Sequence, residues 1–147
     1  MKSRRLKPVA KIAQERENDA ALALSEYRKV VDQHDAKLIE LRHYHEEYIQ
    51  RLNEAGRIGM NIAQINDYRS FIACLAIAVK QQEALLLECD QQLQAKNAAW
   101  IQLRGRHQAL DKVIDRYHQQ EGQTREKREQ AESDERAQHT GKNYTPE

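Results

Sequence analysis

The residues best suited to chemistry in this 147-residue chain are six histidines and two cysteines. His43 and Glu47 stand four positions apart, so they share one face of a helix and could hold a metal ion weakly. Cys74 and Cys89 are too far apart for a metal-binding knuckle or a redox pair. The spacing favours a solvated surface pair and two reduced thiols, so we expect no metal site.

Sequence motifs for common catalytic chemistry are missing from the chain. It contains no G-x-x-x-x-G-K phosphate loop, no G-x-G-x-x-G, no G-x-S-x-G and no H-E-x-x-H. Nucleotide, hydride, acyl and zinc chemistry therefore lack their usual parts. We expect a protein without catalytic residues, cofactor or small-molecule substrate.

Charge and hydropathy exclude further classes of protein. Lys and Arg number 24 and Asp and Glu 23, for a net charge of +1, so no overall basic field holds nucleic acid. The longest nearly apolar run, Phe71 to Val79, is well short of the roughly 18 to 20 residues that span a bilayer. No apolar core of a signal peptide follows the basic residues 2–7. We therefore expect a cytoplasmic protein without a transmembrane helix.

The few prolines and glycines divide the chain into two long segments. Residues 9–55 and 60–104 contain neither Pro nor Gly, while Gly56 and Gly59 bracket a short connection. Asn61 can cap a second helix, with Gln64 as its reciprocal partner. The pattern predicts a single coiled-coil domain with helix 1 at about 8–55, a loop at 56–61, helix 2 at about 62–137 and a frayed tail at 138–147.

Alternating steps of three and four residues connect the apolar positions of both segments. Counted from Leu6 to Ala55 and from Ile65 to Tyr117, 25 of the 31 positions are apolar, where composition alone gives roughly 12. We call all 31 positions, together with those that continue the same steps along the second helix, the seam. Their period of 3.5 predicts an all-α fold, a long two-helix antiparallel coiled-coil hairpin with an overhanging C-terminal helix end.

Facing Ala55 with Ile65 sets the register of the hairpin. Every further layer then joins residues whose numbers add to 120, which places the small Ala20 against the large Trp100. Three seam positions are histidines, His34, His45 and His107, where a polar residue more often sets register than titrates for function. Beyond Tyr117 the second helix is predicted to lack a partner within the chain. Its seam positions there are Glu121, Thr124, Arg128, Ala131 and Glu135.

The two edges of the predicted seam differ in polarity. One edge carries Tyr44, Phe71, Ala78 and Leu85, whereas the other carries mainly charged and amide side chains. The apolar edge either widens the core of the hairpin or forms a surface that binds a partner.

Several short elements, in this order and spacing, resemble the FliJ proteins of the bacterial flagellar type III export apparatus. The likeness runs from about Ser3 to Ala137, and one departure from the family pattern is Ala131, where a lysine is common. The matching elements are Ser3-Arg4-Arg5-Leu6 with Pro8-Val9, Tyr44 and Tyr48, Gly56 to Met60, Tyr68-x-x-Phe71-Ile72-x-x-Leu75, Trp100, Leu110-Asp111-Lys112-Val113, and Glu129-Gln130 with Asp134-Glu135-x-Ala137.

The resemblance implies a non-catalytic coiled coil similar to the central stalk of rotary ATPases, in the cytoplasm and peripherally associated with the inner membrane at the flagellar base. It implies that the paired ends of the coil bind the hexameric export ATPase and that the protein escorts export chaperones. The residues expected at the ATPase contact are Leu6, Ala10, Ala13, Leu110, Ile114 and Tyr117.

The resemblance also implies a surface nearer the loop that contacts the membrane-embedded export gate. Four of its residues lie on the seam, so their substitution could act through folding. The residues expected at the gate contact are Leu41, Tyr44, Tyr48, Phe71, Leu75, Ala78 and Gln82.

Two other classes of function remain open at this point. A static coiled-coil scaffold or adaptor needs the same helices, but it has no need of one apolar edge. A nucleic-acid binder would have to use the basic residues 2–7, which are not interleaved with aromatic side chains.

Overall fold

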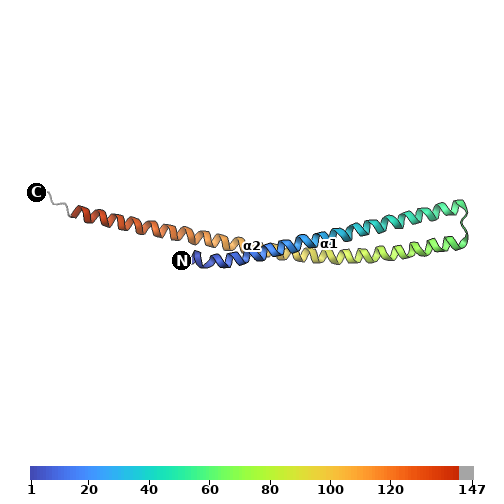
Figure 1. Cartoon of the computed structure of the whole chain (residues 1–147), viewed down its shortest axis with the longest axis horizontal. Coiled ribbons are helices and arrows are strands. Elements are labelled where there is room, and N and C mark those ends of the chain that lie inside the picture. Colours follow the sequence, from blue (N-terminus) through green and yellow to red (C-terminus); the bar gives the residue numbers. More distant parts are fainter. Residues whose placement is uncertain (143–147) are drawn as a thin grey trace. The chain divides into compact units, whose positions relative to one another are not determined.

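The computed structural model describes residues 1–142 and contains two long helices that pack against each other. α1 spans Lys2–Ile58 and α2 spans Ile62–Lys142. Figure 1 shows α1 passing from blue to green and α2 from green to red, with one short connection between them. The described residues contain no strand, so the predicted all-α helical hairpin is confirmed.

The described chain divides into two compact units. The first joins residues 1–18 of α1 with the part of α2 that starts at residue 101. The second comprises residues 19–100, and therefore holds the loop and both helices beside it. We call these the terminal unit and the loop unit.

α1 begins six residues before the predicted start, with Pro8 inside it. Proline lacks an N–H and cannot donate to the carbonyl of the residue four positions earlier, which is why a start near Pro8 was expected. The turns ahead of it are stabilised by packing instead. Ser3 is buried, and its backbone N–H donates to the carboxylate of Glu121 on α2 at 3.2 Å.

The connection between the helices is shorter than the predicted 56–61. α1 continues through Gly56 and ends at Ile58, where Gly59 adopts a φ of 88°. A positive φ is open to glycine without steric cost, and the N–H groups of Gly59 and Met60 both donate to the carbonyl of Ala55. The Asn61 half of the predicted cap is confirmed, since Asn61 Oδ1 accepts a hydrogen bond from the backbone N–H of Gln64 at 2.9 Å.

α2 extends beyond its predicted end near residue 137. Residues 138–142, expected to fray, are helical, and the rest of the predicted frayed tail lies outside the described residues. Good helix formers such as Arg136, Ala137 and Gln138 explain the continuation.

The predicted seam is the buried face of both helices. Every seam position up to Tyr117 except Lys96 is buried or half-buried, and Leu24, Leu38 and Leu75 are among the least exposed. Lys96 instead directs its ammonium group over the ring of Tyr27, 5.3 Å from the centroid. No described side chain is fully buried, because two helices alone cannot enclose a wide core.

Contacts across each unit lie within one turn of the predicted layers. In the loop unit His34 contacts Gln82 and Tyr48 contacts Tyr68, pairs whose numbers add to 116. In the terminal unit Glu17 contacts His107, and those numbers add to 124. When the layers add to 120, a residue also contacts residues one turn before or after its layer partner on the opposite helix. The numbers of those pairs add to 116 or 124.

One part of α2 is apolar enough to meet a length and composition test for a membrane-crossing helix. An 18-residue window within Ile62–Gly141 has a mean hydropathy of 1.4, and 11% of it is buried. The sequence predicted no such segment because its longest nearly apolar run, Phe71 to Val79, has nine residues. That prediction did not count the apolar residues that follow the run. The core helix of a soluble protein passes the same test, although such a helix is mostly buried.

We expect Ala20→Leu to destabilise the loop unit, because Ala20 and Trp100 are both half-buried at the same predicted layer. Overpacking a fitted layer costs about 1 to 3 kcal/mol. Thermal unfolding followed by circular dichroism measures the effect. Ala36→Leu, on the exposed face of the same helix, is the matched control. Equal melting temperatures for both variants would show that the layer is not closely packed.

Candidate functional site

The residues predicted to contact the export gate lie together in the loop unit but differ in exposure. Tyr44 is 44% exposed and Phe71 46%. Leu41, Tyr48 and Ala78 are half-buried, whereas Leu75 and Gln82 are buried. Only the first two therefore offer large apolar area to a partner.

Tyr48 organises an aromatic cluster beside this exposed surface. Its ring centroid lies 4.6 Å from that of Phe71 and 5.9 Å from that of Tyr68. The guanidinium of Arg51 lies over the same ring at 5.0 Å and also pairs with Glu47 at 2.8 Å. Phe71 thus packs against the opposite helix and is exposed as well, so at this residue both alternatives left open for the apolar edge apply. Arg51 was not predicted, although its position three residues after Tyr48 indicates the contact.

Gln82 belongs to the packing between the helices. Its side-chain amide donates to the backbone carbonyl of His34 at 2.9 Å and lies 3.3 Å from the His34 ring nitrogen Nδ1. At 6% exposure it has little surface to give a partner. His34 and Gln82 therefore form a polar layer of the seam.

The side chains that the sequence offers as metal ligands or reactive thiols make other contacts in the structure. Glu47 pairs with Arg51, four positions along the same helix. In the part of the chain that the structure describes, no three His, Cys, Asp or Glu side chains form a group able to hold a metal ion. Cys74 is exposed and Cys89 is buried, and both are free thiols. The Cys89 thiol, as hydrogen-bond partner of the Tyr27 hydroxyl, raises the pKa of Tyr27 above its usual value.

The residues predicted to contact the ATPase belong to the terminal unit and face the opposite helix. Ala10 is buried, and Leu6, Ala13, Leu110, Ile114 and Tyr117 are half-buried. Larger apolar area is exposed beside them at Val9, 47%, and Ile12, 50%. Sequence reasoning missed these two because both lie off the seam.

Glu121 has a partner within the chain, contrary to the prediction. Its carboxylate accepts from the Ser3 hydroxyl at 2.5 Å and from the Ser3 backbone N–H, one of the α1 amides without an intrahelical partner. The Ser3 hydroxyl is the main reason that the pKa of Glu121 lies below its usual value, and the Ser3 N–H, the terminal amine and His118 act in the same direction. Contacts across the seam end at Glu121, and the described side chains after Gly122 are all exposed.

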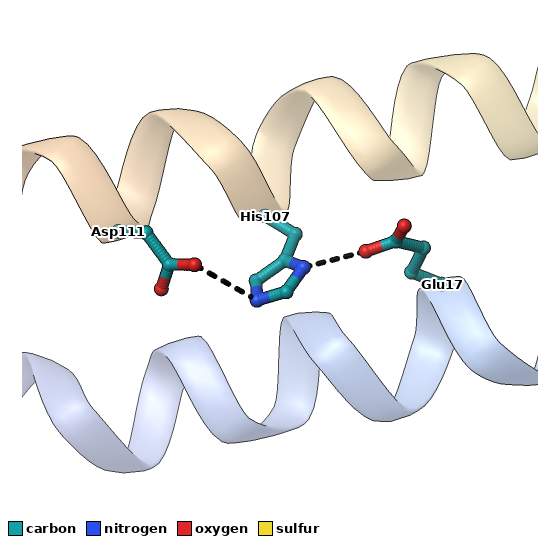
Figure 2. Close-up of polar contacts among 3 residues, drawn as sticks. All are labelled: Glu17, His107 and Asp111. Carbon is teal, nitrogen blue, oxygen red and sulfur yellow. Dashed lines mark hydrogen bonds and ion pairs between the residues drawn. The ribbon is translucent and has the colours of Figure 1, made fainter.

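A second polar contact of the terminal unit joins three residues, which we call the histidine triad. The imidazole of His107 lies between the carboxylates of Glu17 on α1 and Asp111 on α2 (Figure 2). Nδ1 lies 2.5 Å from Glu17 Oε2, and Nε2 lies 3.2 Å from Asp111 Oδ2. The side chains of His107 and Glu17 are 19% and 18% exposed, so the bond between the helices is largely shielded from water.

The packing of the helices and the side chains left exposed define the class of protein. It is a two-helix coiled coil with exposed aromatic side chains near its loop and a polar, exposed end of α2. The sequence profile of the family described as Flagellar FliJ protein matches residues 1–143. The chain therefore belongs to the FliJ family and has a role in flagellar type III protein export. The family is a non-catalytic component of the export apparatus. No curated protein and no solved structure matches the chain.

The Ser3–Glu121 contact predicts a loss of stability in acid. A carboxyl group whose pKa is lowered by folding stabilises the folded state above its unfolded pKa of about 4.3. That contribution is lost as the pH falls through the lower, folded pKa. We expect the melting temperature to fall less between pH 7 and pH 3 in Glu121→Gln than in the unaltered protein, as measured by circular dichroism.

Glu132→Gln is the control for this measurement, because Glu132 lies on the same helix and is exposed. It should keep the acid sensitivity of the unaltered protein. A fall of equal size in Glu121→Gln and the unaltered protein would contradict the contribution of the Ser3 contact.

Proposed function

We propose that this protein is a stalk of the export apparatus that binds the hexameric export ATPase through its terminal unit and the export gate through its loop unit. Binding to the membrane-embedded gate would hold it at the inner membrane. The likeness to the family supports the escort of export chaperones as a third activity. A static coiled-coil scaffold is the alternative that the experiments below separate from this proposal.

The exposed aromatic side chains of the loop unit carry the proposal for the gate. Tyr44 and Phe71 expose nearly half of their surface on one edge of the seam, next to the half-buried Ala78. Phe71 is already held against Tyr48 and so loses little conformational freedom when a partner covers it, and exposed aromatic side chains often dominate binding energy. A scaffold that only spaces two partners apart needs no such edge.

The free helix end of the terminal unit supports the proposal for the ATPase. After Gly122 the described part of α2 exposes every side chain and has no seam contact with α1. A single helix rich in alternating charges is typically exposed to solvent, so its surface is free for contact with another protein. The predicted contacts Leu6, Ala13 and Tyr117 are half-buried, so the ATPase would reach them mainly at their outer edges.

Removal of the chain after Gly122 should abolish stimulation of the export ATPase while leaving the two-helix pairing intact. The Ser3 contact with Glu121 is kept in this variant. Phosphate release by the purified ATPase measures stimulation, and thermal unfolding measures the pairing.

A shorter deletion of residues 143–147 is the control and should retain stimulation. Full stimulation by the chain that ends at Gly122 would reject a role for the helix end. A loss of stimulation together with a lower melting temperature would show that the deleted residues stabilise the fold.

Tyr44→Ala should weaken binding to the purified export gate by about thirtyfold or more, the loss typical of a buried interface aromatic. Tyr44 makes a ring contact with its neighbour His43, at 6.3 Å, and lies off the seam, so the free energy of unfolding should change by less than about 1 kcal/mol. Stimulation of the ATPase should be unchanged.

Leu87→Ala is the matched control, because Leu87 is 63% exposed on the same unit but lies off the seam edge. Phe71→Ala should reduce both gate binding and stability, since it also removes the contact with Tyr48. Equal gate binding by Tyr44→Ala and Leu87→Ala would favour the scaffold.

A further inference from the structure

The first three turns of α1 carry a local excess of positive charge. Residues 1–14 contain five of the 24 Lys and Arg side chains and none of the 23 Asp and Glu side chains, whereas the rest of the chain has more carboxylates than cations. All five cations are exposed, and none of them forms an ion pair with a described residue. We call them the basic patch, which consists of Lys2, Arg4, Arg5, Lys7 and Lys11.

The basic patch does not stabilise the helix that bears it. The N-terminal end of an α-helix carries a partial positive charge, so acidic side chains stabilise that end and basic ones do not. The first turn of α1 has no acidic residue. Glu121 of α2 reaches this end of α1, but its carboxylate already accepts hydrogen bonds from Ser3. The positive charge is therefore available to an anionic partner outside the chain.

Apolar side chains are exposed next to the basic patch. The face of this stretch that packs on α2 holds residues 3, 6, 10 and 13, which are buried or half-buried. The spacing of a helix places Arg5, Lys11 and Ile12 on the opposite face. Ile12 is 50% exposed there, and Val9, at the border of that face, is 47% exposed. Cations and apolar area are therefore open to the same partner.

Among anionic partners, the surface of a membrane matches this combination best. Clusters of four to eight Lys and Arg side chains on a helix are typical of binding to anionic lipids. Apolar side chains among such cations can enter the boundary between the headgroups and the acyl chains. Proteins that hold single-stranded nucleic acid add aromatic side chains on which bases stack, and residues 1–14 contain no aromatic residue.

The rest of the terminal unit does not cancel the charge of the basic patch. Residues 123–142 of α2 contain five Lys and Arg and five Asp and Glu side chains, so this free end is neutral as a whole. Arg125, at its start, lines a cleft of about 250 Å³ together with Arg4 and Lys7. One cation of α2 therefore adds to the patch.

We propose that the basic patch binds the surface of a membrane that contains anionic lipids, with the headgroup phosphates beside the cations and with Val9 and Ile12 in the headgroup layer. This contact is with lipid itself, and it lies in the terminal unit, whereas the proposed contact with the export gate lies in the loop unit. The inference does not rest on the proposed function, because the patch is defined by charge and exposure alone.

Sedimentation of the full chain with lipid vesicles tests the proposal. Vesicles of phosphatidylcholine with about one-third phosphatidylglycerol should bind the protein, pure phosphatidylcholine should not, and about 0.5 M salt should release it. The double variant Arg5→Gln, Lys11→Gln should bind about twentyfold more weakly or worse, since each cation near an anionic surface contributes about fivefold. Ile12→Gln should weaken binding severalfold without a change of charge, because it removes apolar area from the headgroup layer.

The double variant Lys127→Gln, Arg136→Gln is the matched control, because it removes the same charge from exposed positions on the free end of α2. It should bind the anionic vesicles as the unaltered protein does, and circular dichroism should show equal helix content in all variants. Absence of binding to the anionic vesicles would overturn the proposal and favour an acidic protein surface as the partner. Equal binding by the two double variants would overturn it as well. Neither the ATPase nor the gate is present, so failure of the proposed function would not affect these results.

Discussion

Pairing of two apolar stripes across a seam of constant register is the constraint on which the whole structure depends. Two helices enclose so little volume that no described side chain is fully buried. Stability must therefore come from many half-buried layers, each of modest value, instead of one central cluster. A shift by one residue would turn polar side chains of one helix toward the apolar seam of the other. Constant register is thus the condition for folding, and small residues such as Ala20 and Ala55 fit where large ones would separate the helices.

Polar side chains on the seam limit the registers that the helices can adopt. Gln82 donates to the backbone carbonyl of His34, and Glu17 bonds to His107, each only in the observed alignment. A slipped register would leave such groups half-buried without partners, which costs more than the bond itself contributes. The polar layers therefore weaken the core locally while excluding competing alignments, as isolated polar residues do in other coiled coils.

A core this narrow leaves large areas of both helices free for partners, which explains how a chain without a catalytic motif serves a role in protein export. In the loop unit the aromatic cluster around Tyr48 fixes Phe71 at the edge of the seam while leaving much of its ring exposed. In the terminal unit α1 begins opposite Glu121, and α2 continues beyond the start of α1 to Lys142. In both units, packing between the helices positions the residues at the edge of the seam. The surfaces that this packing leaves uncovered are the ones available for binding.

The sequence by itself determined the two helices and their seam, because an apolar period of 3.5 and the lack of Pro and Gly are local properties that a narrow core cannot override. It also indicated Tyr44 and Phe71 as exposed. Only the tertiary structure decided where α1 begins, since the turns before Pro8 depend on a contact with Glu121, 118 positions away in the chain. It also decided that Phe71 packs on Tyr48 and that His107 lies between two carboxylates. These features depend on side-chain positions set by the opposite helix, and a pattern along one helix does not contain them.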